Sequence, residues 1–408
     1  MSKFRSVAKI AATFKSELVV PDHLTTEFFQ LALQNGLSLD DVAVEEILFS
    51  VGATVRENSS DIFRVVVNFT YSSNGKQSKE ISLIVKTIKS DTSNKNELLM
   101  NRDIIPQLNK LWTNEEINFA PKCFYISSDP VPTYVFEDLI SSGFRLGDHV
   151  GGLNEEHSRI LIRKIAQFHA TTMVLADKEP ELLKPFSNLS LTNDITNANN
   201  KNYIENLDEL ADIIEPWLGY GEISDKLRDI EQNFSSRISK CVENRPDGIK
   251  VLNHGDLWIN NVLFKYEKDT PKDLSFIDLQ MSYHGSPGLD LNFFFNTSVQ
   301  LSVLKDKRTS LEEEYYNQLQ MSLKKLDFDK IPTLKAIQQE ILDKEFYGFW
   351  AMVQSFPMTS FSRDDTNIEL YNDMNEIHLK RKMMFSSNRM TDTLKYSLLR
   401  FDELGIFN

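Results

Sequence analysis

One short segment combines side chains that are suited to transferring a phosphoryl group. The sequence HGDLWINN, residues 254–261, has the pattern His-x-Asp-x-x-x-x-Asn, and Asp278 follows at the end of the apolar run LSFI. The carboxylate of Asp256 is suited to accept the hydrogen bond of an attacking hydroxyl. The amide oxygen of Asn261 and the carboxylate of Asp278 are suited to hold Mg²⁺ on the phosphates of ATP. Taken alone, the octet is a short motif that also arises by chance.

The elements around this segment are expected to direct its side chains towards one cleft. The sequences KVLNHGD and NNVLFKY are typical of short strands on either side of a loop that carries Asp256 and Asn261. The sequence LSFID predicts a returning strand that brings Asp278 alongside. The charged stretch KYEKDTPKD between the two strands is typical of a solvated turn.

A lysine interrupts an apolar strand upstream. Lys86 lies within SLIVKTI, where burial is costly unless the ammonium group meets an anion. Glu97 follows at the start of a helix, in a position that could turn inward to Lys86. The pattern predicts an ion pair that places Lys86 on the α- and β-phosphates of the nucleotide. The alternative is a lysine on an edge strand whose amine reaches solvent.

The segment YVFEDL, residues 134–139, ends the expected small lobe. An adenine ring could pair with backbone groups of an extended connector here, so Glu137 and Leu139 are candidate nucleotide-binding residues. The alternative is an ordinary edge strand.

The pattern along the 408 residues predicts an α+β fold with two lobes. The first 45 or so residues are expected to be helical, followed by a hairpin of residues 61–71 and 80–88, then a helix over 96–111 and short strands. These elements predict a small, mostly antiparallel β lobe over residues 1–139. Helical periodicity, as over 155–175 and 225–242, predicts a larger, mainly helical lobe over residues 140–408.

Composition excludes several other classes. With 45 Lys and Arg against 59 Asp and Glu, the net charge of −14 disfavours binding to nucleic acid or to an acidic membrane. The seven histidines form no HExxH pair, and Cys123 and Cys241 form no CxxC, so neither a catalytic zinc site nor a redox pair is indicated. No apolar run is long enough to span a membrane. We therefore expect a cytoplasmic protein with no evident obligate protein partner and a small molecule as its partner.

Several segments together resemble a known family. These segments are IVKTIK, the helix of Glu97, VFEDLISSGFR, IAQFHA, LNHGDLWINNVLFKY, FIDLQMS and FDELGIF. They resemble the choline-kinase-like phosphotransferases (the CHK kinase-like domain, with an aminoglycoside phosphotransferase-type kinase fold), and specifically the ecdysteroid kinase-like family.

The resemblance implies a protein-kinase-like fold and ATP- and magnesium-dependent phosphorylation of a hydroxyl on a small, apolar molecule, such as an ecdysteroid or a xenobiotic alcohol undergoing detoxification. In this family Asp256 would be the catalytic base, Asn261 and Asp278 the metal ligands, and Lys86 with Glu97 the phosphate clamp. Asp290 would brace the catalytic loop.

One departure from the family and two alternatives remain. Residues 54–60 contain no glycine, although glycine lets backbone N–H groups approach phosphates closely, so a looser phosphate cover is expected.

A catalytically silent binding protein and a choline- or aminoglycoside-type kinase are the competing functions. The following aromatic and sulfur-containing residues are either core or the wall of an apolar acceptor pocket: Phe346, Tyr347, Phe349, Trp350 and Met352.

Overall fold

The computed structural model describes residues 18–52, 60–72, 75–89, 95–113, 115, 117–187, 200–359, 381–385 and 387–408. The chain divides into two compact units. The smaller unit comprises Met1–Ser93 and Lys122–Asp138, and the larger unit comprises Asn94–Pro121 and Leu139–Asn408. Residues 94–121 thus group with the larger unit although they precede residue 139. The division into domains 1–139 and 140–408 stays a prediction.

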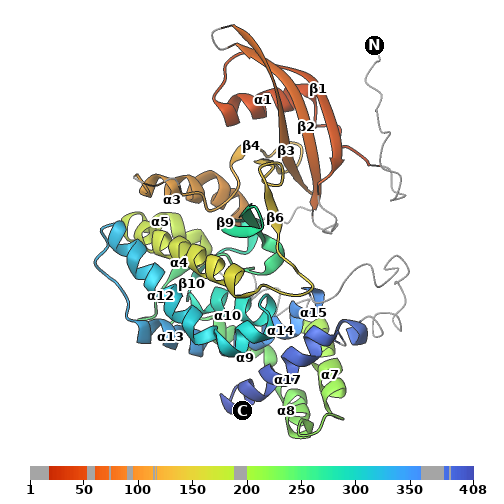
Figure 1. Cartoon of the computed structure of the whole chain (residues 1–408), viewed down its shortest axis with the longest axis vertical. Helices are drawn as coiled ribbons and strands as arrows, with labels where there is room; N and C mark the ends of the chain where they lie inside the picture. The colour runs from red at the N-terminus through yellow and green to blue at the C-terminus, as the bar shows by residue number, and fades with distance from the viewer. Residues whose placement is uncertain are drawn as a thin grey trace. The chain divides into compact units, whose positions relative to one another are not determined.

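The smaller unit is a five-stranded sheet with one helix, α1 (Thr26–Leu37), packed against it (Figure 1). Every pair of neighbouring strands is antiparallel, in the order β1-β2-β3-β5-β4. The strands are β1 (Val42–Val51), β2 (Ser60–Ser72), β3 (Lys76–Ile88), β4 (Cys123–Ser127) and β5 (Thr133–Glu137).

Alternation along β2 explains why this sheet has a buried face. Phe63, Val65, Val67 and Phe69 are buried at every second position, which is the period of a strand. They belong to the same apolar cluster as Phe29 of α1. The predicted hairpin is confirmed as β2 and β3, although Asn74 of its turn lies outside the described residues.

The expectation of helix throughout the first 45 or so residues is wrong. Helix α1 begins after its N-cap Thr25, whose hydroxyl accepts a hydrogen bond from Phe28 N, and it ends at Ser38 in a left-handed conformation. The sequence VAVEEILFSV then forms β1 because its backbone pairs along β2. Two adjacent glutamates lower the strand propensity of that segment. Its pairing with β2, rather than its local sequence, therefore determines that it forms a strand.

The larger unit is mainly helical. Its helices are α2 (Lys95–Leu99), a π-helical turn (Met100–Ile104), α3 (Ile105–Leu111), α4 (Glu155–Lys178), α5 (Pro180–Leu183), α7 (Asn200–Ile214), α8 (Gly221–Glu231), α9 (Phe234–Val242), α10 (Gly288–Thr297), α11 (Leu301–Asp306), α12 (Arg308–Lys325), α13 (Leu334–Asp343), α14 (Glu345–Gln354), α15 (Phe356–Thr359) and α17 (Asn388–Glu403). Its short strands are β6 (Phe144–Leu146), β7 (Val251–Asn253), β8 (Val262–Glu267), β9 (Thr270–Phe276) and β10 (Tyr283–Gly285).

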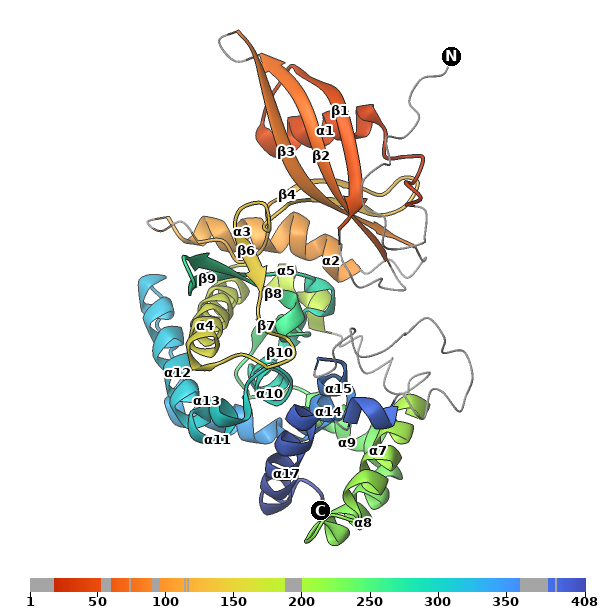
Figure 2. The same cartoon turned by 45° about the vertical axis from the view of Figure 1, so that its right-hand side comes forward.

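Two apolar clusters form the core of the larger unit. The first joins α4 and α12, which lie side by side in Figures 1 and 2, to α10 and the β8–β9 hairpin. The second joins α7, α8, α9, α14 and α17. The predicted fold class is therefore confirmed: a smaller antiparallel unit accompanies a larger, mainly helical one. Among the described residues, no helix is both long and apolar enough to cross a membrane.

Candidate functional site

The loop that carries Asp256 is held between two strand pairs of the larger unit. Strand β7 pairs with β10, and strand β8 pairs with β9. The chain leaves β7 at Asn253 and enters β8 through a short 3₁₀ turn, Ile259–Asn261. Both ends of the loop are thus fixed by backbone ladders, as the sequence predicted.

Asp256 and Asn261 are in direct contact. The amide Nδ2 of Asn261 donates to Oδ2 of Asp256 at 2.8 Å and to the backbone oxygen of Asp256 at 3.0 Å. Because the amide nitrogen is used in this way, the Asn261 side chain has its Oδ1 as the atom that can meet a cation. The loop therefore orients a carboxylate and an amide oxygen with one set of hydrogen bonds.

The β8–β9 ladder brings Asp278 next to Asn261. Val262 is paired with Phe276, and the N–H of Ile277 donates to the backbone oxygen of Asn261 at 3.0 Å. Asp278 follows in the left-handed region (φ 61°, ψ 63°), a conformation that is uncommon outside glycine and that often marks a functional position. Nε2 of Gln280 donates to Asp278 Oδ2 at 3.3 Å.

A buried carboxylate braces this loop from below. Asp290, at the start of α10, is 1% exposed, and its two oxygens accept the backbone N–H groups of His254 (2.7 Å) and Gly255 (2.9 Å). Nε2 of His169 lies 3.1 Å from Asp290 Oδ2, and Nδ1 of His169 lies 2.8 Å from the Tyr315 hydroxyl. We call Asp290, His169 and Tyr315 the loop brace. The bracing role expected of Asp290 is visible in these hydrogen bonds.

The proton positions within the loop brace follow from burial. Burial, followed by the charge of Asp290, raises the pKa of Tyr315 well above its usual value. The phenol therefore keeps its proton, and because a carboxylate oxygen accepts, His169 Nε2–H is the donor to Asp290.

His254 is fixed in the same way. Its Nδ1 accepts from Asp256 N (3.3 Å), and its Nε2–H donates to the Ile277 oxygen (3.0 Å). Burial lowers the pKa of His254 despite the nearby carboxylates of Asp290 and Asp278, which agrees with a neutral ring.

The oxygen donors beside Asp256 suit a hard cation. Asn261 offers an amide oxygen and Asp278 a carboxylate, and magnesium prefers such ligands together with phosphate oxygens and water. Magnesium in such sites takes one or two protein oxygens together with phosphates and water, so this donor set fits a cation that arrives with a nucleotide.

The candidate phosphate clamp is divided between the two units. Lys86 lies on β3 opposite Tyr134 of β5 and is 6% exposed, which is unusual for a lysine. Glu97, on α2 of the larger unit, is 2% exposed. Its neighbour Asn96 donates from Nδ2 to the Ser282 oxygen at 3.0 Å, which ties α2 to the turn that follows Asp278. The pairing of Lys86 with Glu97 stays a prediction.

The candidate connector residues occupy the end of β5 and the turn after it. Glu137 is the last residue of β5, and its N–H donates to the Lys122 oxygen at 2.9 Å. Leu139 begins a turn in which its carbonyl accepts from Ser142 N and Phe144 N, both at 3.0 Å. Their role in nucleotide binding stays a prediction, and the loop over residues 54–60 lies outside the described residues except for Ser60.

Sequence reasoning missed the residue that anchors this connector. Asp138 is 1% exposed, and its Oδ2 accepts from Arg64 Nε (2.8 Å) and Ser82 Oγ (2.7 Å). A short-range signal existed, because Arg64 and Ser82 interrupt the apolar pattern of their strands. His169 and Tyr315 were also missed as partners of Asp290, since neither lies near it in sequence.

The aromatic cluster on α14 is core. Phe346, Tyr347, Phe349, Trp350 and Met352 are all at most 7% exposed and belong to the second apolar cluster. Trp258, within the loop that carries Asp256, packs against the same cluster. Aromatic core therefore extends to the edge of the loop that carries Asp256.

Comparisons with known proteins agree with this picture at the level of family. The model of the ecdysteroid kinase-like family matches residues 56–328. No curated protein matches this chain. Among solved structures, an ethanolamine kinase of Plasmodium vivax is 14% identical, with 85% of this chain and 81% of that chain covered at a TM-score of 0.37. Wild-type aminoglycoside 2′-phosphotransferase-IIIa in its GDP complex is 13% identical, with coverages of 92% and 98% at a TM-score of 0.40.

Proposed function

Because the chain belongs to the ecdysteroid kinase-like family, we propose that it transfers the γ-phosphoryl group of ATP, together with Mg²⁺, to a hydroxyl of a small molecule. The observation that carries the proposal is the 2.8 Å hydrogen bond from Asn261 to Asp256, next to Asp278. A carboxylate held by an amide, with a second carboxylate beside it, is the arrangement that phosphoryl transfer uses.

In the proposed reaction Asp256 accepts the hydrogen bond of the acceptor hydroxyl and then its proton. The acceptor oxygen forms a bond to the γ-phosphorus, the bond from that phosphorus to the bridging oxygen breaks, and ADP leaves. The loop brace keeps the backbone at His254 and Gly255 in place, so that the Asp256 carboxylate is positioned before the acceptor arrives.

Asn261 and Asp278 would hold the magnesium ion, which neutralises charge on the phosphates when it is bound. Lys86 and Glu97 are proposed as the clamp on the α- and β-phosphates. Glu137 and Leu139 are proposed to meet the nucleotide base through their backbone. Lys86 and Glu97 are both buried, which is uncommon for charged side chains. Their burial therefore supports the proposed role in the phosphate clamp.

We assign the acceptor to apolar alcohols, either an ecdysteroid or a xenobiotic alcohol, in the cytoplasm. Support comes from the family and from the aromatic core that reaches the catalytic loop at Trp258. Aromatic and aliphatic side chains stabilise such an acceptor through buried area, at about 25 cal/mol per Å².

The test is Asp256→Asn, assayed for turnover with ATP and Mg²⁺ against a panel of sterols, phenols, choline and aminoglycosides. An amide is a much poorer base, so kcat is expected to fall by about 10²- to 10⁴-fold. The matched control is Asp269→Asn, the same change at an exposed position between β8 and β9, which should keep full activity.

Nucleotide binding separates loss of catalysis from loss of folding. ATP with Mg²⁺ should raise the melting temperature of Asp256→Asn about as much as that of the unaltered protein. Unaltered turnover in Asp256→Asn would refute the assignment of the base. No turnover by the unaltered protein, despite stabilisation by ATP and Mg²⁺, would favour a silent binding protein.

A further inference from the structure

A buried backbone N–H in the catalytic loop is satisfied by a side chain from outside the loop. Ile259 begins the 3₁₀ turn that carries Asn261, and the first N–H groups of a helical turn have no partner within it. Trp258, the residue before the turn, forms no side-chain cap. Ile259 is fully buried, so bulk water does not reach its N–H. This N–H instead donates to the hydroxyl oxygen of Ser298 at 3.0 Å.

Ser298 lies directly after α10, the helix whose first turn carries Asp290. The two oxygens of Asp290 accept the N–H groups of His254 and Gly255, and the hydroxyl of Ser298 accepts the N–H of Ile259. The catalytic carboxylate follows the first two of these N–H groups in the chain and precedes the third. Residues at the two ends of one helix therefore hold the loop on both sides of that carboxylate.

The hydroxyl of Ser298 is oriented so that its oxygen is available to Ile259. Thr297 Oγ1 donates to the Phe293 oxygen at 2.7 Å and lies 3.0 Å from Ser298 Oγ. Because a hydroxyl carries one proton, the proton between these two hydroxyls comes from Ser298. Ser298 thus donates to Thr297 and accepts from Ile259.

The backbone around Ser298 is fixed by segments that do not belong to the loop. Ser298 N donates to the Phe294 oxygen at 3.0 Å, and the Ser298 oxygen accepts from Leu153 N at 2.8 Å. Gln300 N donates to the Leu153 oxygen at 3.0 Å, which completes a parallel bridge between Leu153 and Val299. The place of the hydroxyl is therefore set independently of the loop that it holds.

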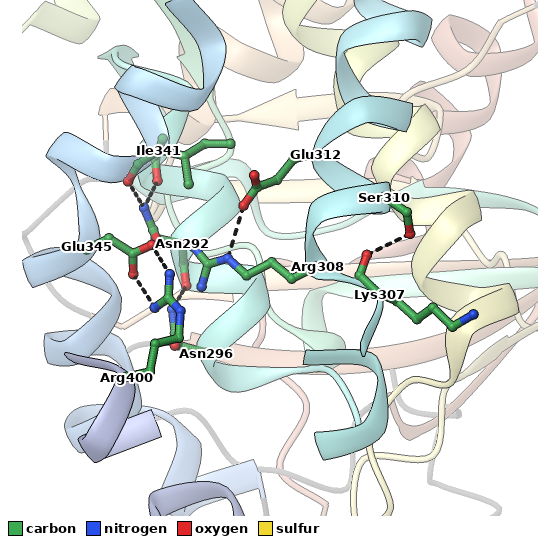
Figure 3. A network of polar contacts seen from close by, with 10 residues as sticks. Asn292, Asn296, Lys307, Arg308, Ser310, Glu312, Ile341, Glu345 and Arg400 are labelled. Carbon is green, nitrogen blue, oxygen red and sulfur yellow. Dashed lines mark hydrogen bonds and ion pairs between the residues drawn. The ribbon is translucent and has the colours of Figure 1, made fainter. Parts of the chain in front are cut away.

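A buried ion-pair network keeps α10 itself in place (Figure 3). Arg308 of α12 donates to Asn292 Oδ1 of α10 at 3.0 Å, and Asn292 Nδ2 donates to the Ile341 oxygen of α13 at 2.7 Å. Arg308 and Arg400 of α17 both pair with Glu345 of α14, at 2.6 Å and 2.5 Å. Helix α10 is thus tied to its neighbours by buried polar contacts, and it offers a preorganised support for the loop.

The hydrogen bond at Ile259 acts on Asn261 through the turn. Asn261 N donates to the Trp258 oxygen, and the Asn261 oxygen accepts from Ile277 N, both at 3.0 Å. Nδ2 of Asn261 donates to the Asp256 carboxylate at 2.8 Å, which leaves Oδ1 for a cation. A shift of the turn at Ile259 would therefore displace the oxygen that is proposed to meet the metal.

We propose that Ser298 is a positioning residue whose hydroxyl, through the backbone of Ile259, places the Asn261 amide oxygen and so determines how tightly Mg²⁺ binds together with ATP. This inference rests on the kinase function proposed above, in which Asn261 and Asp278 hold the cation. Magnesium requires nearly ideal octahedral geometry with short bonds to oxygen, so a small displacement of one ligand weakens its binding. Asp290 secures one end of the loop, and Ser298 secures the other.

The first experiment measures how ATP binding depends on Mg²⁺ in the unaltered protein and in Ser298→Ala. Calorimetric titration with ATP at a series of Mg²⁺ concentrations gives the concentration at which the gain in affinity is half complete. Ser298→Ala should raise this concentration by about ten-fold, the factor that corresponds to the loss of one hydrogen bond, and should change the affinity for metal-free ATP much less. The matched control is Ser224→Ala, which removes another fully buried hydroxyl, bonded to the Ala211 oxygen at 2.9 Å, and should leave the Mg²⁺ dependence unchanged.

Amide hydrogen exchange reports on the hydrogen bond itself, without nucleotide or metal. Exchange of the segment 257–262 should be about ten-fold faster in Ser298→Ala and unchanged in Ser224→Ala. Ser298→Cys keeps the size of the side chain but offers a weaker acceptor, so it should change both measurements in the same direction as Ser298→Ala with less loss of packing. Exchange that stays slow in both Ser298 variants would overturn the proposal. Faster exchange with an unchanged Mg²⁺ dependence would overturn it too, because the role of Ser298 would then be structural only.

Asn261→Ala distinguishes failure of this proposal from failure of the proposed function. If Asn261→Ala raises the required Mg²⁺ concentration and Ser298→Ala does not, the positioning role is refuted and the kinase assignment stands. If neither variant raises it, Asn261 is not a metal ligand, and the positioning role is refuted together with that part of the proposed function. If Ser298→Ala raises it in a protein that phosphorylates no acceptor, the positioning role is supported and the kinase assignment fails.

Discussion

The loop brace and two tryptophans at the second apolar cluster, Trp258 and Trp350, differ in how their polar atoms are used. In the brace, each oxygen of Asp290 and each ring nitrogen of His169 has a partner, at 2.7–3.1 Å. The indole nitrogens of Trp258 and Trp350, by contrast, are buried and have no partner among the residues that the structure describes. The contrast shows which groups the internal hydrogen bonds of this chain hold in place. They fix the backbone next to Asp256, whereas the two indole N–H groups take no part in them.

Removing the brace should have the largest effect. Asp290→Ala leaves the N–H groups of His254 and Gly255 and the Nε2–H of His169 without an acceptor in a buried site. We expect the free energy of unfolding to fall by about 3–5 kcal/mol, as when one member of a buried polar pair is removed. Urea titration followed by circular dichroism measures this.

The corresponding change in the second apolar cluster, Trp350→Phe, removes an N–H for which the described part of the chain offers no partner. It should cost well under half as much as Asp290→Ala, because only packing area is lost. Equal losses of stability for the two variants would contradict the contrast between the loop brace and these tryptophans.

An effect smaller than that of Asp290→Ala is expected at Gly255, where the loop brace meets the loop. Gly255 has a φ of 85°, and a Cβ there would lie 1.9 Å from the backbone oxygen of Met281. Gly255→Ala must therefore shift the loop or the turn after Asp278, at a cost of about 2–4 kcal/mol. Gly143→Ala is the matched control, since Gly143 also has a positive φ but a Cβ there meets nothing within 4 Å. A similar loss of stability in both variants would mean that conformational strain alone, and not the contact with Met281, sets the cost.

The smallest effect concerns pH. Burial lowers the pKa of His254, so the folded protein binds this proton less readily than the unfolded chain does. The free energy of unfolding should therefore decrease as the pH falls below about 6.5, the ordinary value for histidine. His254→Gln should make this decrease shallower, whereas the same change at the exposed His149 should not. A slope that is unchanged in His254→Gln would mean that other groups, such as His284 with its pKa of about 4, account for the acid sensitivity.

The sequence predicted those parts of the molecule that depend on local pattern. The β2–β3 hairpin follows from alternation, and the neighbourhood of Asp256, Asn261 and Asp278 follows from the spacing of a loop between short strands. Strand β1 was not predicted, because only its pairing with β2 distinguishes it from a helix.

The partners of Asp290 could not be predicted, for a different reason. His169 and Tyr315 reach Asp290 from α4 and α12, and no sequence spacing specifies which helices pack together. The same holds for the aromatic residues of α14. They were recognised as a cluster, but whether an indole nitrogen finds a partner depends on side-chain packing in three dimensions.

The path of the chain between the two units has a consequence for biosynthesis and for protein engineering. The chain leaves the smaller unit after Ser93, contributes Lys95–Leu111 to the larger unit, and returns for β4 and β5. Met100, Ile104 and Leu108 of this segment lie in the first apolar cluster of the larger unit. A ribosome therefore delivers part of the larger unit's core before the smaller unit's sheet is complete, and that segment must wait for residues 139–408 before it can be buried. Expression of residues 140–408 alone would yield a polypeptide that lacks a piece of its own interior.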